Sequence, residues 1–303
     1  MSGDEARPTV LSRSAAAEAV LKDAGVEDAR REAARLAAWA LDVPLARYYA
    51  IRDEVFPEDR LPAFLDGVRR RALREPFAYI TGSFGFHGLD FAVGPGVLIP
   101  RPETELLVSC ALEAGLALPG DSVDFLDLCT GSGCVAVSLA IALKEKGRTP
   151  HAAATDVSPD ALKVARDNAH RLSPGLDLVF LLADLVPPEG SRFDLLVSNP
   201  PYVRSDEIAP LAPEITRYEP REALDGGPDG LAFYRRIVAS APRYLKAGGT
   251  LLVEHGSDQA EEVRALFAAD PLFEGIGTRN DLAGNPRVTF ARAASPSDLL
   301  ESL

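Results

Sequence analysis

Along most of this chain, from Glu103 to residue 292, apolar runs of strand length alternate with longer runs of helix length. The runs of strand length cover residues 123–128, 151–155, 178–182, 193–197, 249–254, 272–278 and 287–292. The helical runs cover residues 103–116, 132–145, 158–171, 229–245 and 257–269. This alternation predicts an α/β fold with one seven-stranded, mostly parallel sheet that helices cover on both faces. Only a turn separates the last two strands, so we expect them to pair antiparallel at one edge.

The first part of the chain follows another pattern. Residues 9–75 are rich in Ala, Leu, Arg and Glu and show helical periodicity, with prolines between short helices. A Gly-rich alternation over residues 84–93 then predicts a short β-hairpin. We therefore expect a helical bundle domain over 1–76, a hairpin linker over 77–100, and the sheet domain over 101–303.

Charge is unevenly distributed along the chain. The net charge is -13, whereas residues 1–80 carry 14 acidic and 13 basic side chains, so nearly all the excess lies in the sheet domain. An acidic domain repels a phosphate backbone, which makes nucleic acid a less suitable substrate. A protein substrate fits this charge better, and we expect no direct contact with nucleic acid.

The remaining composition limits location and metal chemistry. No apolar run approaches the length of a membrane span, and the first residues do not resemble a secretion signal, so we expect a cytoplasmic protein without membrane contact. The three cysteines have no metal-ligand spacing, and the four histidines are too scattered for a metal site or a catalytic triad. We expect no metal.

A glycine loop follows the strand at 123–128: its residues are Cys129, Thr130, Gly131, Ser132 and Gly133. Glycines let a ligand approach the backbone, and the start of the next helix supplies free N–H groups. Asp127 is expected to organise this loop by accepting its N–H bonds. Asp156 closes the next strand, where a carboxylate can bind two ribose hydroxyls, although it could also cap the helix that starts near Ser158. Together these features predict an adenosine site.

A second polar segment, Asn199-Pro200-Pro201-Tyr202, follows the buried strand at 193–197. The Asn amide both donates and accepts hydrogen bonds, the prolines stiffen the backbone, and the Tyr ring offers a flat face. This chemistry suits a planar NH2 group. The alternative is that Asn199 only initiates a turn, as Asn before Pro often does.

Six stretches carry a resemblance to a known family: Pro76–Gly82, Val97–Glu105, the glycine loop, Asn199–Tyr202, Glu219–Leu224, and Leu252–Gly256 with Gln259. On these motifs the chain resembles the release-factor glutamine methyltransferases, the PrmC/HemK family within the class I S-adenosylmethionine-dependent methyltransferases. The resemblance implies a Rossmann-like sheet, S-adenosylmethionine as cofactor, and peptide-chain release factors as protein substrates. The methylated group would be the glutamine of a Gly-Gly-Gln loop, and we expect the enzyme to be a monomer.

The resemblance also implies roles for single residues. Cofactor contacts would come from Asp127, the glycine loop, Asp156, Asp184, Leu185 and Asn199. Cys129 stands where a glycine is usual, and Leu185 stands where some relatives place an aromatic residue against the adenine. Arg101 and Glu103 would touch the substrate, or else form a salt-bridged helix start.

For catalysis, we expect the Asn199 side-chain oxygen and the Pro200 carbonyl to accept the two N–H bonds of the glutamine amide. Tyr202 would pack against the flat amide, with Pro201 beside it. Orientation of this kind can supply roughly 7 to 11 kcal/mol of a barrier without metal or covalent intermediate.

Other functions remain open at this point. Within methyl transfer, the target could be a glutamine of a ribosomal protein or an exocyclic adenine amine in DNA. A nicotinamide-dependent oxidoreductase would share the sheet but needs a third glycine that this loop lacks. A non-enzymatic interaction module is the last alternative. From the family, the helical domain is expected to recognise the release factor.

Overall fold

The computed structural model describes residues 7–188 and 190–294. These residues form two compact units. The described residues up to Gly82, together with Ala212–Tyr218, make up a helical unit. Ser83–Leu211 and the residues from Glu219 onward make up a sheet unit.

The helical unit contains short helices packed around one apolar core. They are α1 (Val10–Asp23), α2 (Ala29–Ala40), α3 (Leu45–Ile51), α4 (Leu61–Ala72), α5 (Phe77–Thr81) and α9 (Pro213–Tyr218). Leu21, Leu36 and Phe64 are fully buried at its centre. The periodicity of the first 75 residues thus corresponds to real helices whose apolar stripes face one another. Helix α9 was not predicted, because one and a half turns carry too little periodicity.

The sheet unit contains seven strands in the order β5-β4-β3-β6-β7-β9-β8. Their bounds are β3 (Ser122–Leu128), β4 (Thr149–Asp156), β5 (Leu178–Leu182), β6 (Phe193–Ser198), β7 (Leu245–Glu254), β8 (Phe273–Asn280) and β9 (Pro286–Ala293). The first five strands in this order are parallel, whereas β9 pairs antiparallel with both β7 and β8. The predicted mostly parallel sheet with an antiparallel edge is confirmed.

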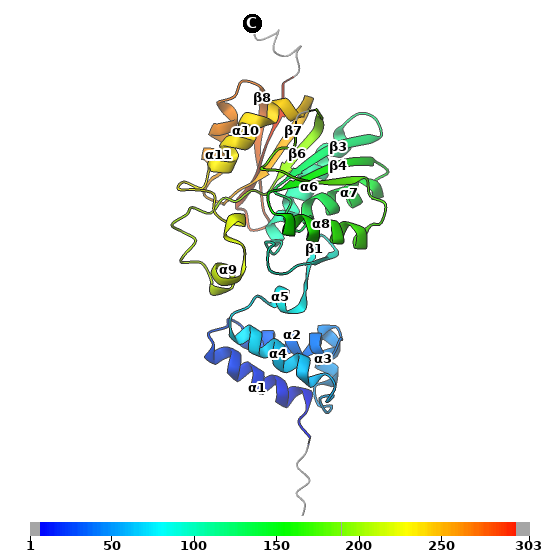
Figure 1. Cartoon of the computed structure of the whole chain (residues 1–303), viewed down its shortest axis with the longest axis vertical. Helices are drawn as coiled ribbons and strands as arrows, with labels where there is room; N and C mark the ends of the chain where they lie inside the picture. Colours follow the sequence, from blue (N-terminus) through cyan, green and yellow to red (C-terminus); the bar gives the residue numbers. More distant parts are fainter. Residues whose placement is uncertain (1–6, 189, 295–303) are drawn as a thin grey trace, which may run out of the picture. The chain divides into compact units, whose positions relative to one another are not determined.

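Helices cover both faces of this sheet (Figure 1). Helices α6 (Glu105–Ala117), α7 (Cys134–Glu145) and α8 (Pro159–Leu172) pack on one face, and α10 (Ala232–Tyr244) and α11 (Ala260–Ala268) on the other. On β3, Phe125 belongs to the first core and its neighbour Leu126 to the second, and both are fully buried. Because successive strand residues point to opposite faces, a strand covered on both sides must be apolar throughout.

Short elements complete the sheet unit. The predicted hairpin is formed by β1 (Ser83–Phe86) and β2 (Leu89–Ala92), which pair antiparallel. The predicted helix at 103–116 starts with a 3-10 turn, η1 (Pro102–Thr104), and a second such turn, η2 (Arg221–Ala223), was not predicted. Within the described residues, no helix combines the length and the apolar character that crossing a bilayer requires.

The strand order reverses direction between β3 and β6, which are neighbours in the sheet. In parallel register, Leu128 of β3 lies beside Ser198 of β6 on one side and Thr155 of β4 on the other. The glycine loop and the Asn199–Tyr202 segment therefore leave the same edge of the sheet side by side. Ligands of open α/β sheets bind at this point, where the order reverses.

Candidate active site

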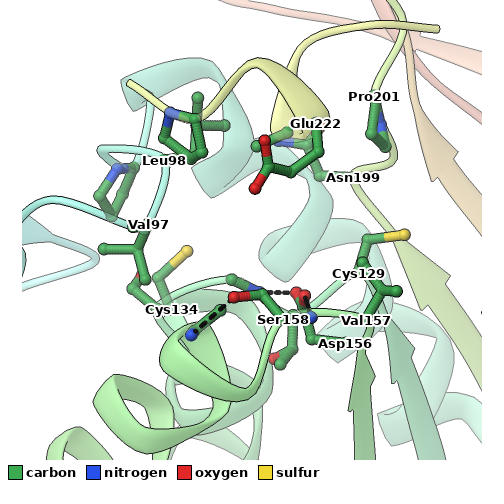
Figure 2. A pocket seen from close by; sticks show the side chains of 18 of the residues that line it. Val97, Leu98, Cys129, Cys134, Asp156, Val157, Ser158, Asn199, Pro201 and Glu222 are labelled. Carbon is green, nitrogen blue, oxygen red and sulfur yellow. Dashed lines mark hydrogen bonds between the residues drawn. The ribbon is translucent and has the colours of Figure 1, made fainter. Parts of the chain in front are cut away.

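A cavity opens at this carboxyl edge of the sheet (Figure 2). It encloses about 900 Å³ that no protein atom fills, its open mouth included. Residues at or just beyond the ends of four adjacent strands line it: Cys129 after β3, Asp156 at the end of β4, Asp184 beyond β5 and Asn199 after β6. The fold thus brings together side chains that lie up to 70 residues apart in the sequence.

The glycine loop has a left-handed backbone at three positions, with φ of +60° at Cys129, +55° at Gly131 and +79° at Gly133. Asp127 lies beneath it, 1% exposed, and accepts a 2.6 Å hydrogen bond from Thr130 Oγ1. Burial raises the pKa of Asp127 to about 7, against the lowering effect of the Thr130 hydrogen bond. Asp127 supports the loop from below and is not among the residues that line the cavity.

Gly133 is not among the residues that line the cavity either. Its role is to allow close packing between two helices. A Cβ atom built on Gly133 would lie 3.1 Å from the Cβ of Ala165 and 3.2 Å from its Cα. The absence of a side chain therefore lets α7 begin directly against α8. Thr130, Gly131 and Ser132 do line the cavity.

The Asp156 carboxylate links the glycine loop to the start of α8. Its Oδ2 accepts from the Gly131 N–H at 2.9 Å, and its Oδ1 accepts from the Ser158 N–H at 2.9 Å. Burial raises the pKa of Asp156 in spite of these bonds. Ser158 itself caps α8 by accepting from the Ala161 N–H. A carboxylate has about four acceptor sites, so Asp156 can hold this backbone and still accept from a ligand.

The Asn199–Tyr202 segment is held from several sides. Asn199 Nδ2 donates to Thr104 Oγ1 at 3.1 Å, and the Tyr202 carbonyl accepts from Gln259 Nε2 at 3.0 Å. A Cβ on Gly226 would lie 2.7 Å from the Tyr202 Cα, so a glycine is needed where that loop crosses. Asn199 and Pro201 line the cavity, whereas Pro200 and Tyr202 are not among the lining residues. Burial raises the pKa of Tyr202 to about 12, so its hydroxyl stays protonated.

Arg101 lines the cavity and is held by a buried acid. Its Nη2 donates to Glu219 Oε1 at 2.6 Å, and Glu219 also accepts from the Ile99 N–H at 3.2 Å. The predicted salt bridge at Arg101 thus exists, but with a distant residue and not within the helix start. Glu103 is not part of the lining.

Residues that sequence reasoning did not assign also line the cavity. Glu222, in η2, points its carboxylate into the cavity (Figure 2). Val97, Leu98 and Phe233 add apolar surface. The run from Glu219 to Leu224 contributed to the family resemblance, which was the one available signal for Glu222. Leu185 is buried in the lining, and Asp184 forms a 2.8 Å ion pair with Arg236.

These side chains fit S-adenosylmethionine. Three carboxylates (Asp156, Asp184 and Glu222) and one guanidinium (Arg101) line the cavity, which suits a ligand of net positive charge. The buried Ser132 Oγ makes no hydrogen bond within the part of the chain that the structure describes, and it is a further polar atom in the loop. Apolar side chains on the walls suit a purine. Among the described residues, no three His, Cys, Asp or Glu side chains are grouped so that they could hold a metal ion.

A glycine loop, a ribose-type acid and an Asn-Pro-Pro-Tyr segment on this strand order define a class I S-adenosylmethionine-dependent methyltransferase. Comparisons with known proteins narrow the class. Residues 14–82 match the model of the PrmC N-terminal domain, and residues 102–218 match that of the methyltransferase small domain. The chain belongs to the family of release factor glutamine methyltransferases.

Relatives of high coverage support this membership. The chain is 45% identical over 275 residues to the release factor glutamine methyltransferase of Geobacter sulfurreducens, covering 90% of this chain and 92% of that protein. It is 41% identical over 272 residues to the one of Cereibacter sphaeroides, covering 90% and 94%. A solved structure of the release factor-specific protein-(glutamine-N5) methyltransferase from Alicyclobacillus acidocaldarius is 30% identical, covers 67% of this chain and 99% of that chain, and has a TM-score of 0.40.

Proposed function

We propose that this enzyme transfers the methyl group of S-adenosylmethionine to the side-chain amide nitrogen of the glutamine in a release-factor Gly-Gly-Gln loop. The observation that carries the proposal is the adjacency of two segments at one cavity. Cys129 and Asn199 follow directly on the paired residues Leu128 and Ser198, so the glycine loop and the Asn199–Tyr202 segment leave neighbouring strands together.

The chemistry required of the protein is orientation. A carboxamide nitrogen is a weak nucleophile because its lone pair is delocalised into the carbonyl. The Asn199 Oδ1 and the Pro200 carbonyl would accept the two N–H bonds of the substrate, which directs the nitrogen and stabilises the charge that develops on it. The cofactor supplies a methyl group on a positively charged sulfur. The Asn199 Nδ2 is engaged by Thr104, which leaves Oδ1 as the acceptor for the substrate.

The cofactor contacts are part of the proposal. Thr130, Gly131 and Ser132 would approach the cofactor with their backbone, Asp156 would accept from the ribose hydroxyls, and Asp184 and Leu185 would contact the adenine. Asp127 and Gly133 would act indirectly, by holding the loop and its helix in place. Pro201, Tyr202, Arg101 and Glu103 would serve the substrate, with Arg101 fixed by Glu219.

The proposal extends to the helical unit and to the surroundings of the enzyme. The helical unit would recognise the release factor at a distance from the reacting loop. The acidic net charge of -13 supports a protein target without direct contact to nucleic acid. We propose a monomer that acts in the cytoplasm.

Incubation with methyl-labelled cofactor and purified release factor tests this function. Mass spectrometry should locate one methyl group on the glutamine of the Gly-Gly-Gln peptide, and a release factor with that glutamine replaced by alanine is the matched control. Ribosomal protein and adenine-containing DNA are added as competing substrates. Label on either of these, with none on the release factor, would overturn the proposal.

A further inference from the structure

A chain of buried side chains runs from strand β7 to the cavity. Asn199 Nδ2 donates to Thr104 Oγ1 at 3.1 Å. The Thr104 hydroxyl also lies near enough to the Glu254 carboxyl to lower its pKa as a hydrogen-bond donor. Thr104 and Glu254 are each 1% exposed, and Glu254 Oε2 has no hydrogen-bond partner among the described residues. Asn199 lines the cavity. We call Glu254, Thr104 and Asn199 the relay, and it ends at the cavity.

The sheet register explains why these residues meet. Ser198 of β6 lies beside Val253 of β7, so the next residues, Asn199 and Glu254, end neighbouring strands at the same edge. Thr104, from η1 before α6, accepts from the Asn199 amide and is near enough to the Glu254 carboxyl to influence its pKa. Thr104 and Glu254 lie far apart in the sequence, and no sequence pattern predicts that they meet.

The direction of the hydrogen bonds follows from the number of hydrogens. An ionised carboxylate can only accept, so the single hydroxyl hydrogen of Thr104 must point to Glu254. Thr104 Oγ1 is then an acceptor for Asn199, and the amide must turn its NH2 toward Thr104 and its oxygen to the other side. A protonated Glu254 could itself donate, and this would free the Thr104 hydrogen to bond the Asn199 oxygen instead.

We propose that Glu254 is a positioning residue whose ionised carboxylate, acting through Thr104, holds the Asn199 amide with its oxygen toward the substrate. The inference rests on the proposed function, because it assigns Asn199 Oδ1 to the substrate N–H. A buried carboxylate with an unpartnered oxygen is costly for stability, which argues against a purely structural role.

The surroundings of Glu254 set the pH range in which the relay changes. The charged groups that face it are Arg101 and Glu103, before α6, and Arg287 of β9, with the buried phenols of Tyr202 and Tyr234 nearby. Burial is the largest influence and raises the pKa of Glu254 to about 7. Methyl transfer should therefore decline as the pH falls below about 7.

Steady-state kinetics of Thr104→Val, Thr104→Ser and Glu254→Gln test the relay. We expect kcat to fall roughly tenfold to a hundredfold in Thr104→Val and Glu254→Gln, with the Kd for S-adenosylhomocysteine within about twofold of wild type. Thr104→Ser keeps the hydroxyl and should retain most activity. The double variant should lose no more than the worse single variant, because both act on one relay. Thr289→Val, which removes another buried hydroxyl, bonded to His255, is the matched control.

A second readout does not depend on methyl transfer. The side-chain NH2 resonance of Asn199, assigned by its loss in Asn199→Asp, should titrate near pH 7 in the wild type and stay constant in Glu254→Gln. If the wild type titrates but methylates no release factor, the proposed function fails and the relay stands. An Asn199 resonance that ignores pH, or a Thr104→Val variant with wild-type kcat, would overturn the relay.

Discussion

Asn199 and Asp156 occupy the same cavity but are expected to act on different steps. Asn199→Ala removes the acceptor that orients the substrate, so kcat should fall by about a thousandfold while the Kd for S-adenosylhomocysteine changes little. Asp156→Ala removes an acceptor for the ribose hydroxyls and should raise that Kd by at least about tenfold. Calorimetry and initial rates on both variants separate the two effects. Equal loss of cofactor binding in both variants would contradict this division of roles.

The Asp156 variant needs a further control, because its carboxylate also accepts from the Gly131 and Ser158 N–H groups. Ser158 also lines the cavity, but its hydroxyl oxygen accepts from the Ala161 N–H as the cap of α8. Ser158→Ala keeps the N–H that Asp156 accepts, so it should lower stability by about 1 kcal/mol without changing cofactor affinity. If Ser158→Ala weakens cofactor binding as much as Asp156→Ala does, the loss of affinity reflects helix capping and not ribose binding.

Glu254 also makes stability depend on pH. Its pKa is raised by burial to about 7 in the folded protein, against 4.5 for the model carboxyl. The folded state then binds a proton that the unfolded state has released between these values, so this contribution to stability is present at low pH and is lost as the pH rises toward 7. Relative to Glu254→Gln, the wild type should lose up to about 3 kcal/mol of unfolding free energy between pH 5 and 8. Urea unfolding of both proteins at several pH values measures this difference, and parallel curves would contradict it.

At the scale of elements, the loop between β3 and α7 combines strain with close packing. Gly133 has φ +79°, and a Cβ there would be tightly packed against Ala165, so Gly133→Ala should lower the unfolding free energy by about 2 kcal/mol. Cys129 already carries a side chain at φ +60°, so Cys129→Gly should stay within about 1 kcal/mol of wild type. Thermal unfolding distinguishes the two, and equal losses would contradict this account of the loop.

Cys129, the first residue of the glycine loop, is not a glycine, yet its backbone has the left-handed conformation that favours glycine. The tertiary context of the loop therefore outweighs the local preference of the residue.

The elements themselves could be predicted because the strands contain short apolar runs and the long helices contain apolar runs of helix length. The central strands are buried on both faces, so their apolar runs end where the strands end, as at Leu128 and Ser198. The short helix α9 has no buried residue of its own and thus no stripe to detect.

The sequence likewise predicted some residues of the candidate site and missed others. Cys129, Asp156 and Asn199 could be placed from the sequence because each comes at or directly after a strand end. Thr104 and Glu222 lie away from the strand ends and could not be assigned. Glu254 ends β7, but its role was also missed, because it depends on residues far away in the sequence, as the contact of Thr104 with Asn199 does. Local sequence patterns do not predict such long-range contacts.

In the whole chain, one short segment belongs to a different unit from its sequence neighbours. Residues 212–218 pack within the helical unit, whereas the residues on both sides of them in the sequence belong to the sheet unit. Glu214 of α9 accepts from Arg74 Nε at 2.7 Å and from Arg71 Nη1 at 2.9 Å, and Arg71 also bonds to the buried Glu32. The Tyr218 hydroxyl donates to the Leu73 carbonyl at 2.8 Å. The next residue along the chain is Glu219, which holds Arg101 at the cavity.

This arrangement makes Glu214 a test of whether the helical unit affects substrate use through the chain. Glu214→Ala leaves Arg71 and Arg74 without their shared partner, so the segment 212–218 should exchange its amide hydrogens faster. We expect kcat/KM for intact release factor to fall roughly tenfold, while the Kd for S-adenosylhomocysteine stays within about twofold. Hydrogen exchange with mass spectrometry and steady-state kinetics measure the two effects.

The control for Glu214→Ala is Asp66→Ala, which removes an exposed partner of Arg69 and should change neither quantity. Acidity provides an independent check. Burial opposes ionisation of Glu214, but the hydrogen bonds from Arg74, Arg71 and the backbone together outweigh it and lower the pKa to about 2. The attachment should therefore persist at pH 5 and weaken only as the pH falls toward 2. Fast exchange of residues 212–218 in the wild type at pH 5, or full activity of Glu214→Ala on intact release factor, would show that the segment does not couple the helical unit to catalysis.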